Sequence, residues 1–469
     1  MTEPSHHFPT VQPDSASRRE FLRRTGALSL AASATPWALS LAAMGEAAAA
    51  TASDYKALVC VFLNGGNDYA NTLVAYDQAS YNSYSNLRSG IALPRDSLGA
   101  TLLAPGAALP NGRQYALAPT LSPLLPVFNA GALSVALNVG TLMQPTTKAQ
   151  YAARSVPLPP KLFSHNDQQS YWQASAPEGA ASGWGGRMGD LLASGNGNAT
   201  FTCVSVSGNA VFLSGNSSSQ YQVFASGPVP VAGIKSALFG SNACSVALSG
   251  LMTDARNQML ESSYASITRR ALTANDQLTS ALDGANLSTA FPAGGLADQL
   301  KLVARMISRS SELGAKRQVF FVSMGGFDNH EGLGGAGGTH AKLLAQVGSA
   351  MAAFYQATKD LGVSRQVTTF TASDFGRTLT SNSTGSDHGW GGMHFVMGDA
   401  VKGRSFIGTA PAVATDGPDD AGQGRLVPSI SVDQYGATLA NWFGVSASDQ
   451  LAVLPNLKNY SARNLDFMA

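Results

Sequence analysis

Apolar runs about as long as a β-strand recur along the chain, and each run stops at a polar loop. They cover residues 58–63, 319–324 and 367–371. A continuous apolar run of this length is typical of a strand that is buried on both faces of a parallel sheet. Between the last two runs, apolar positions from Leu343 to Leu361 follow helical spacing. Strand, helix and strand in this order predict a βαβ unit, and therefore an α/β fold with a mostly parallel sheet sandwiched by helices.

The pattern changes between residues 195 and 300. Short alternating stretches such as TFTCVSVSG and NAVFLSG are separated by Gly, Ser and Asn, which indicates β-hairpin or edge-strand pieces. Two stretches with helical spacing follow. We interpret 195–300 as a β-rich and helical insertion or cap on one α/β domain that covers 53–469. Near the C-terminus, SVDQYGATLANWFGV predicts an amphipathic helix whose inward positions are Tyr435, Leu439, Trp442 and Phe443.

Residues 1–52 predict an export signal rather than a part of the fold. The pair Arg18 and Arg19 precedes Phe21 and Leu22, and a modestly apolar stretch then ends in small residues that offer cleavage sites. This combination matches the twin-arginine signal, and an ordinary signal peptide or an amphipathic helix is the alternative. We therefore expect a periplasmic or secreted protein that the Tat translocon exports. No later apolar run reaches about 18 residues, so we expect no membrane span after cleavage.

Composition narrows the range of partners. Charged residues make up 13% of the chain and the formal net charge is +1, so the charge balance does not favour nucleic acid as a partner. The three cysteines lack C-x-x-C spacing and support neither a disulfide framework nor a thiolate metal site. Cys203 and Cys244 form a disulfide in one interpretation and are buried free thiols in the other.

Carboxylates and histidines gather in the loops that follow the predicted strands. The loops GGFDNHEG, TASDFGR and GSDHGWGGMH contain Asp328, His330, Asp374, Arg377, Asp387, His388 and His394. Ligands of open α/β sheets bind outside the carboxyl ends of the strands, so we expect these loops to converge there. Carboxylate and imidazole ligands without thiolate favour one or two divalent ions of Zn, Mn, Mg or Ca. Hydrogen-bonded Asp–His pairs without a metal are the structural alternative.

Two further polar loops complete the candidate site. The loop LNGGNDYANT offers Asn64 and Asn67 to a substrate and Asp68 to a metal, and an Asx turn that caps the next helix is the alternative. The loop KLFSHNDQQSYWQ offers Ser164 as a nucleophile and His165 as a substrate contact, and a helix N-cap is the alternative.

Other motifs, present or absent, narrow the chemistry. Arg377 is expected either to clamp a phosphate or sulfate or to pair with Asp374, and His394 to contact the substrate. The chain has no G-x-S-x-G, Walker or Rossmann motif, which disfavours α/β-hydrolase, NTPase and dinucleotide chemistry.

The ordered motifs FLNGGNDYANTLV, SHNDQQSYWQ, SGWGGR, GGFDNH, SDFGRTL and TGSDHGWGG resemble those of the DUF1501 family. These are twin-arginine-exported bacterial proteins placed in the alkaline phosphatase and sulfatase superfamily, and the resemblance covers nearly all of the mature chain. It implies an alkaline phosphatase-like fold with a two-metal site at the strand ends and a Ser or Thr nucleophile on one metal. Carried over by position, one metal would be held by Asp328, His330 and His388, and the other would be flanked by Asp68, Asp374 and Ser164.

Two departures from that pattern leave alternatives open. The chain has Asp374-Phe375-Gly376 where the superfamily commonly has Asp-His-Gly, and Asp328 and His330 stand closer together than in the usual Asp-x-x-x-His. Our leading hypothesis is an exported, metal-dependent hydrolase of phosphate or sulfate esters, with a small-molecule or polysaccharide substrate. The competing hypothesis is a non-catalytic, phosphatase-like exported protein that acts in binding or in polysaccharide assembly at the cell surface. A structural calcium site is the third.

Overall fold

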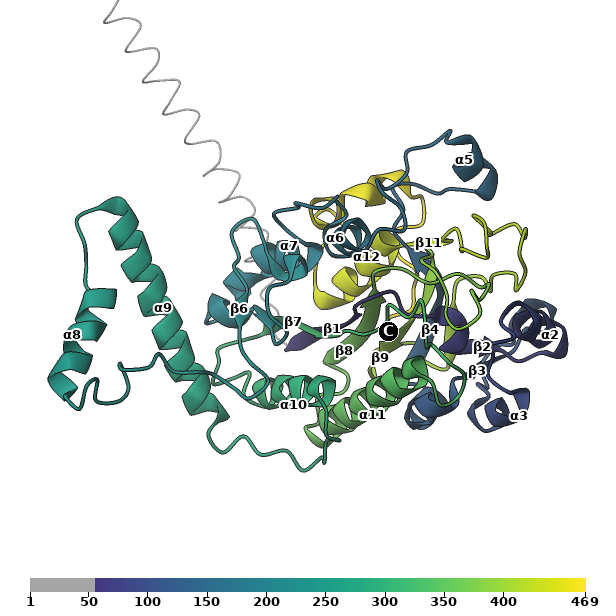
Figure 1. Ribbon diagram of the computed structural model, residues 1–469. Coiled ribbons are helices and arrows are strands. Elements are labelled where there is room, and N and C mark those ends of the chain that lie inside the picture. Colours follow the sequence, from purple (N-terminus) through teal and green to yellow (C-terminus); the bar gives the residue numbers. More distant parts are fainter. Residues whose placement is uncertain (1–54) are drawn as a thin grey trace, which may run out of the picture. The chain divides into compact units, whose positions relative to one another are not determined.

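Figure 1 shows the computed structural model of the protein, which describes residues 55–469. A nine-stranded sheet has the order β10-β4-β9-β8-β1-β7-β5-β6, with β11 paired to β4, and β2 and β3 form a separate antiparallel pair. The strands are β1 (Lys56–Leu63), β2 (Leu73–Ala75), β3 (Tyr115–Leu117), β4 (Leu133–Gly140), β5 (Cys203–Ser205), β6 (Tyr221–Gln222), β7 (Arg317–Met324), β8 (Val367–Ser373), β9 (Gly392–Met397), β10 (Ser405–Ile407) and β11 (Ile430–Ser431). Only β9 is antiparallel to its neighbours in the large sheet.

Helices cover both faces of the large sheet, with α10 and α11 on one side and α6, α7 and α12 on the other (Figure 1). The helices are α2 (Gln78–Leu87), α3 (Arg95–Leu98), α4 (Leu125–Asn129), α5 (Lys148–Ala153), α6 (His165–Ala174), α7 (Trp184–Leu192), α8 (Asn242–Thr253), α9 (Met259–Leu282), α10 (Gly295–Ser308), α11 (Thr339–Asp360), α12 (Val432–Phe443) and α13 (Gln450–Val453). None of the described helices is both long enough and apolar enough to cross a membrane.

Strand β1 shows why its sequence is continuously apolar. Its odd-numbered residues from Ala57 to Leu63 pack in one apolar cluster with α10 and α11, and its even-numbered residues from Leu58 to Phe62 pack in another with α7 and α12. Each fully buried Val, Leu or Phe contributes about 1.5–3 kcal/mol, so a polar residue on either face is costly. Burial on both faces therefore leaves no position for the polar half of an alternating pattern.

The predicted α/β fold with a mostly parallel sheet between helices is confirmed. Strands β7 and β8 lie on either side of β1 and parallel to it, and α11 connects them, as the βαβ pattern predicts. The predicted inward positions of the C-terminal helix are buried, and Tyr435, Leu439 and Phe443 are each 0% exposed. Hydrophobic spacing thus identified both the central strands and the helices that cover them.

Within residues 195–300, β5 and β6 extend the large sheet at one edge. They pair in parallel with each other, and β5 also pairs in parallel with β7. A parallel pair needs a long connection rather than a tight turn, so β5 and β6 are edge strands and do not form a hairpin. Helices α8 and α9 follow them along the chain.

All three cysteines are free thiols, so Cys203 and Cys244 are not paired. Burial raises the pKa of the Cys60 thiol well above its usual value and that of Cys203 to about 12. The predicted export signal at 1–52 lies outside the described residues.

Candidate metal centre at the strand ends

The loops that carry the candidate chemistry follow three adjacent parallel strands. The last residue of β1, Leu63, lies beside Met324 of β7 and Ser373 of β8. The loop after β7 carries Asp328 and His330, and the loop after β8 carries Asp374, Arg377, Asp387 and His388. Gly65, in the loop after β1, permits the close approach, because a Cβ atom there would lie 2.4 Å from the backbone nitrogen of Asp328.

Three histidines direct Nε2 at the carboxylate of Asp328. His330 Nε2 and His388 Nε2 lie 3.1 and 3.3 Å from Asp328 Oδ1, and His165 Nε2 lies 3.5 Å from Asp328 Oδ2. The Nε2 atoms of His330 and His388 are 2.8 Å apart. Ligands about 2.1 Å from a tetrahedral metal lie about 3.4 Å from one another, so this spacing is close to that of a metal's ligands.

Each of these histidines is held in place through its other ring nitrogen. His388 Nδ1 lies 2.7 Å from the carbonyl oxygen of Phe163. His330 Nδ1 lies 3.0 Å from Asp387 Oδ1, and His165 Nδ1 lies 2.6 Å from Asp374 Oδ2. A carbonyl oxygen only accepts, so His388 carries its proton on Nδ1 and has a free lone pair on Nε2. Lone pairs that face each other at 2.8 Å repel unless a proton or a cation lies between them. Metal-binding histidines are held by the same kind of second hydrogen bond.

Burial and charge shift the pKa values of three cluster residues, and at Asp328 and His388 the shift favours the protonation state that binds a metal. Burial lowers the pKa of His388. Burial acts to raise the pKa of Asp328, but the hydrogen bond and charge of Arg377 hold it below its usual value. The hydrogen bond to Asp374 raises the pKa of His165. At neutral pH, Asp328 is therefore ionised and His388 neutral, the forms in which these groups bind a metal.

The donor set narrows the choice among Zn, Mn, Mg and Ca. Three imidazole nitrogens and one carboxylate suit Zn or Mn, whereas Ca and Mg prefer oxygen ligands only. His165, Asp328 and His388 offer ligand atoms within 4.8 Å of one another, and His330 lies against the last two. These four residues, which we call the histidine cluster, fit one ion better than two.

Phe375 packs directly behind the histidine cluster. Its ring centroid lies 4.9 Å from that of His165 and 4.6 Å from that of His388, and the residue is 1% exposed. Gly66 makes room for it, because a Cβ atom there would lie 2.3 Å from the Phe375 ring. The aromatic ring therefore supports the imidazoles from behind, at the position where the superfamily pattern has histidine.

Arg377 and Asp374 are completely buried and hold the loops together. Arg377 Nη1 donates to the carbonyl oxygen of Gly65 at 2.8 Å and to Asp328 Oδ1 at 3.0 Å, and Nη2 donates to the carbonyl oxygen of Ser386 at 2.6 Å. Its donors thus point at the protein rather than at a free anion. Asp374 accepts from the Gly65 amide and from His165, so it orients a histidine and is not itself in the cluster.

Asp68 belongs to a separate buried network. Its Oδ2 lies 2.5 Å from Arg88 Nη2 and accepts a hydrogen bond from Ser386 Oγ at 2.6 Å. Its Oδ1 accepts from the amide of Asn71 at 3.0 Å, which is the predicted Asx-type cap. Because a guanidinium already balances this charge, the structure leaves Asp68 outside the histidine cluster.

Asn67 and His394 also lie in the interior and not in the histidine cluster. Asn67 Oδ1 is 3.0 Å from Nε2 of the buried His340, and its amide nitrogen donates to Thr72 Oγ1. His394 packs against the ring of Trp172 at 4.7 Å, and burial lowers its pKa to about 3. Both residues are less than 5% exposed, so neither presents a side chain to a substrate from this position.

Helix α6 carries Gln169, a residue beside the histidine cluster that was not predicted from the sequence. Ser164 is the residue before the helix, and its Oγ donates to Asp167 Oδ2 at 3.3 Å instead of capping the backbone. His165 and Gln169 follow on one face, and Gln169 Nε2 donates to Asp374 Oδ2 at 2.8 Å. Residues four apart share a helix face, so this spacing was the signal that could have identified Gln169.

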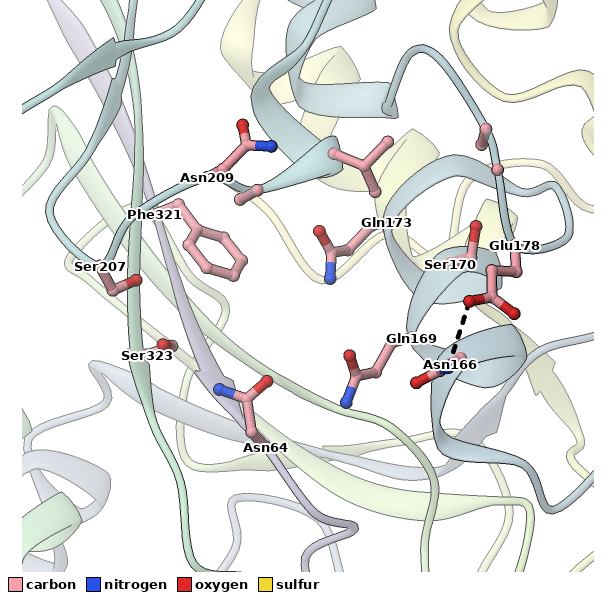
Figure 2. A pocket seen from close by; sticks show the side chains of 14 residues that line it. Asn64, Asn166, Gln169, Ser170, Gln173, Glu178, Ser207, Asn209, Phe321 and Ser323 are labelled. Carbon is pink, nitrogen blue, oxygen red and sulfur yellow. Dashed lines mark hydrogen bonds between the residues drawn. The ribbon is translucent and has the colours of Figure 1, made fainter.

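A cleft of about 370 Å³ lies beside the cluster, and Gln169, which lines the cleft, is linked through Asp374 to His165 of the cluster. Figure 2 shows Asn64 and Ser323 on one side of the cleft and Gln169 and Gln173 of α6 facing them. Of the predicted substrate contacts, Asn64 therefore lines the cleft, and His165 lies in the histidine cluster.

Comparison with known proteins gives a family and weak structural likenesses. No curated protein sequence matches significantly. The chain is similar to the crystal structure of the lipoteichoic acid synthase LtaP from Listeria monocytogenes, with 10% identity and a TM-score of 0.35 over 87% of this chain and 77% of that one. It is also similar to Ps i-CgsB in complex with k-i-k-neocarrahexaose, with 10% identity and a TM-score of 0.34 over 88% and 78%. Likenesses this weak carry no argument about activity. The model of the family described as "protein of unknown function (DUF1501)" matches residues 55–423, and the chain therefore belongs to the DUF1501 family.

Proposed function

We propose that this protein is a metal-dependent hydrolase of phosphate or sulfate esters. The observation that carries the proposal is the histidine cluster, in which three imidazoles held through Nδ1 direct Nε2 at one ionised carboxylate. A Zn or Mn ion held by His165, His330, His388 and Asp328 would supply a Lewis acid that stabilises negative charge on an ester oxygen.

Two cations near the cluster favour an anionic ester over a neutral one. Arg425 Nε donates to the carbonyl oxygen of His388 at 2.8 Å, and its guanidinium lies 5.1 Å from the centre of the Phe163 ring. The side chain of Lys161, two residues before Phe163, is 70% exposed, and its Nζ lies 3.6 Å from Asp167 Oδ2. Positive charge beside the cluster attracts and orients a phosphate or sulfate group, a role that Arg377 is too enclosed to fill.

Ser164 is the nucleophile that we propose. It directly precedes His165 of the cluster and lies at the N-terminus of α6, where the helix dipole favours negative charge. Its Oγ already donates to Asp167 Oδ2 at 3.3 Å, so the Asp167 carboxylate is placed to accept the proton when Oγ attacks phosphorus or sulfur and the bond to the alcohol oxygen of the ester breaks. Water would then cleave the phosphate or sulfate from Ser164.

Metal content and turnover, measured together, test the proposal. We expect the purified wild-type protein to hold about one Zn or Mn ion per chain by mass spectrometry of the metals, and to hydrolyse an aryl phosphate or an aryl sulfate. His388→Ala should lower metal affinity by more than about 100-fold, because it removes a ligand rather than a supporting contact. Ser164→Ala should keep the metal and lose turnover. Asp466→Ala, a change at a residue whose side chain is 84% exposed, is the control that should alter neither.

Three results would refute the proposal. They are wild-type protein without bound Zn or Mn after growth in supplemented medium, full turnover in His388→Ala, and full turnover after chelation. Unchanged turnover in Ser164→Ala alone would refute only the assignment of the nucleophile.

Phe375 favours a second candidate function, a non-catalytic exported protein that keeps the metal for binding. The ring fills the space behind the cluster, which limits the site to fewer metal ligands than the superfamily pattern implies. This candidate predicts stoichiometric metal and tight binding of an ester without hydrolysis, and any turnover that His388→Ala abolishes excludes it.

A further inference from the structure

Uncharged polar side chains make up the largest part of the lining of the cleft beside the histidine cluster. Amide and hydroxyl side chains from the loop after β1, from β7, from α6 and from the loop after β5 face one another across it (Figure 2). Its volume of about 370 Å³ lies in the range of about 300–1,000 Å³ that is common for small-molecule sites. Amides offer both donors and acceptors, which suits a ligand rich in hydroxyl groups.

Several of these groups have no partner in the described part of the protein. The side-chain amide of Asn64 and the hydroxyl of Ser323 form no hydrogen bond with any described residue, and the buried hydroxyl of Ser207 has none either. Leaving the buried Ser207 hydroxyl unpaired is costly, and the half-buried side chains of Asn64 and Ser323 have unused hydrogen-bonding capacity, so together these groups point to a polar ligand in the cleft. Gln169 extends this row to the histidine cluster through its bond to Asp374.

One wall of the cleft includes a small part of an aromatic ring, that of Phe321, which is 5% exposed. Phe321 lines it and is held by Phe62 and Phe212, whose ring centroids lie 5.8 and 5.9 Å away. An aromatic ring flanked by amides and hydroxyls matches the two sides of a sugar, which has an apolar C–H face and a rim of hydroxyl groups.

The charge of the cleft differs from that of the histidine cluster. The only ionisable side chain among the lining residues is Glu178, which is negative and accepts a hydrogen bond from Asn166. A negative group repels phosphate and sulfate, whereas Lys161 and Arg425 near the cluster attract them. The cleft thus suits the neutral part of a substrate, and the cluster suits its anionic part.

We infer that the cleft binds the neutral rings of a saccharide. If the proposed function holds, on which this assignment of the substrate class rests, the ester group of that saccharide lies at the histidine cluster. Gln169 lines the cleft and donates to Asp374, which bonds to His165 of the cluster, so one substrate can place a ring in the cleft and its ester at the metal.

Binding to defined oligosaccharides tests the inference. The probes are linear hexasaccharides of glucose, galactose and mannose, each neutral and 6-O-sulfated, titrated into the wild-type protein in a calorimeter. We expect at least one neutral hexasaccharide to bind, and Asn64→Leu and Ser323→Val to weaken that binding by about tenfold each, the loss expected for one or two hydrogen bonds. Asn82→Leu, at an exposed position of α2, should bind as the wild type does.

Failure of this inference can be told apart from failure of the proposed function. His388→Ala should lose the metal and still bind the neutral hexasaccharide, and the 6-O-sulfated form should gain affinity only when metal is present. If no neutral hexasaccharide binds, or if both cleft variants bind it at full strength while still folded by circular dichroism, the inference is overturned. If a neutral hexasaccharide binds but the protein holds no metal, the inference stands and the proposed function fails.

Discussion

Two aspartates that follow neighbouring strands differ in burial and in the side chains that they contact. Asp68 follows β1, is 1% exposed and contacts the guanidinium of Arg88. Asp328 follows β7, has a side chain that is 46% exposed and faces three histidines. In both, charged neighbours outweigh the effect of burial and hold the pKa below its usual value. Both are therefore ionised and both contact an arginine, Arg88 at Asp68 and Arg377 at Asp328, but only Asp328 also faces three imidazoles.

Because of this difference, Asp68 is a structural carboxylate, whereas Asp328 is suited to bind a metal. At Asp68 the protein supplies a permanent cation, and further donors use the remaining lone pairs. At Asp328 the Arg377 guanidinium bonds one carboxylate oxygen, and three imidazoles also face the carboxylate, one of which has its Nδ1 proton committed to a carbonyl oxygen. That arrangement leaves lone pairs facing one another, so an added cation completes it. We call these two regions the arginine network and the histidine cluster.

Removal of Arg88 should have the largest effect and fall only on stability. Arg88→Leu leaves the Asp68 carboxylate buried without its cation and also removes bonds to the carbonyl oxygens of Thr378 and Leu379. We expect the free energy of unfolding to fall by about 3–5 kcal/mol in urea denaturation. Metal content per folded molecule should not change. The double variant Arg88→Leu with Asp68→Asn should recover part of the loss, and a loss below about 1 kcal/mol in the single variant would contradict this view of the network.

The arginine network should also make stability depend on pH through His340. Burial lowers the pKa of this histidine to about 4, whereas it is about 6.5 in an unfolded chain. As pH falls from 6.5 to 4 the unfolded chain binds the proton first, so the free energy of unfolding decreases by about 3 kcal/mol over this window. Above pH 6.5 this contribution is constant.

His340→Gln checks this pH dependence. Glutamine keeps an amide that can bond to Asn67 Oδ1, the partner of His340 Nε2, but does not titrate. We expect urea denaturation at pH 7.5, 6 and 5 to show a shallower decline in the variant than in the wild type. His394, whose pKa burial lowers to about 3, adds a decline that remains in both proteins. Equal slopes in the two proteins would show that His340 does not set this dependence.

The sequence predicted the central strands closely, because a strand that is buried on both faces is apolar along its whole length. The apolar runs 58–63, 319–324 and 367–371 lie within β1, β7 and β8, and the strands extend them by no more than two residues at either end. The strand-end rule also indicated which loops meet, and the structure brings Asp328, His330 and His388 together. These are consequences of one sheet geometry, which the pattern of apolar residues encodes.

The contacts that distinguish the two regions could not be predicted in the same way. The partner of His388 Nδ1 is the backbone oxygen of Phe163, 225 positions away, and any residue type there would supply the same atom. Arg88 lies 20 residues beyond Asp68 and directly after α2, where nothing local indicates that its side chain turns inward. Residue type and spacing identify acidic residues near a site, but only the packed structure shows which of them also has imidazoles directed at it.

A matched pair of Asp→Asn changes gives the smallest and most selective test. Asp387→Asn keeps an oxygen that can accept from His330 Nδ1 but loses the charge that makes the imidazole a stronger ligand, so metal affinity should fall about 10–100-fold. The Asp387 side chain is 40% exposed, and its removal should cost less than about 1 kcal/mol of stability. Asp68→Asn should instead lower the free energy of unfolding, while the folded molecules bind the metal with wild-type affinity.

Competition with a fluorescent zinc chelator measures the metal affinity, and urea denaturation of the metal-free proteins measures the free energy of unfolding. Unchanged affinity in Asp387→Asn would remove His330 from the ligand set, and weakened affinity in folded Asp68→Asn would show that the arginine network and the histidine cluster are one site.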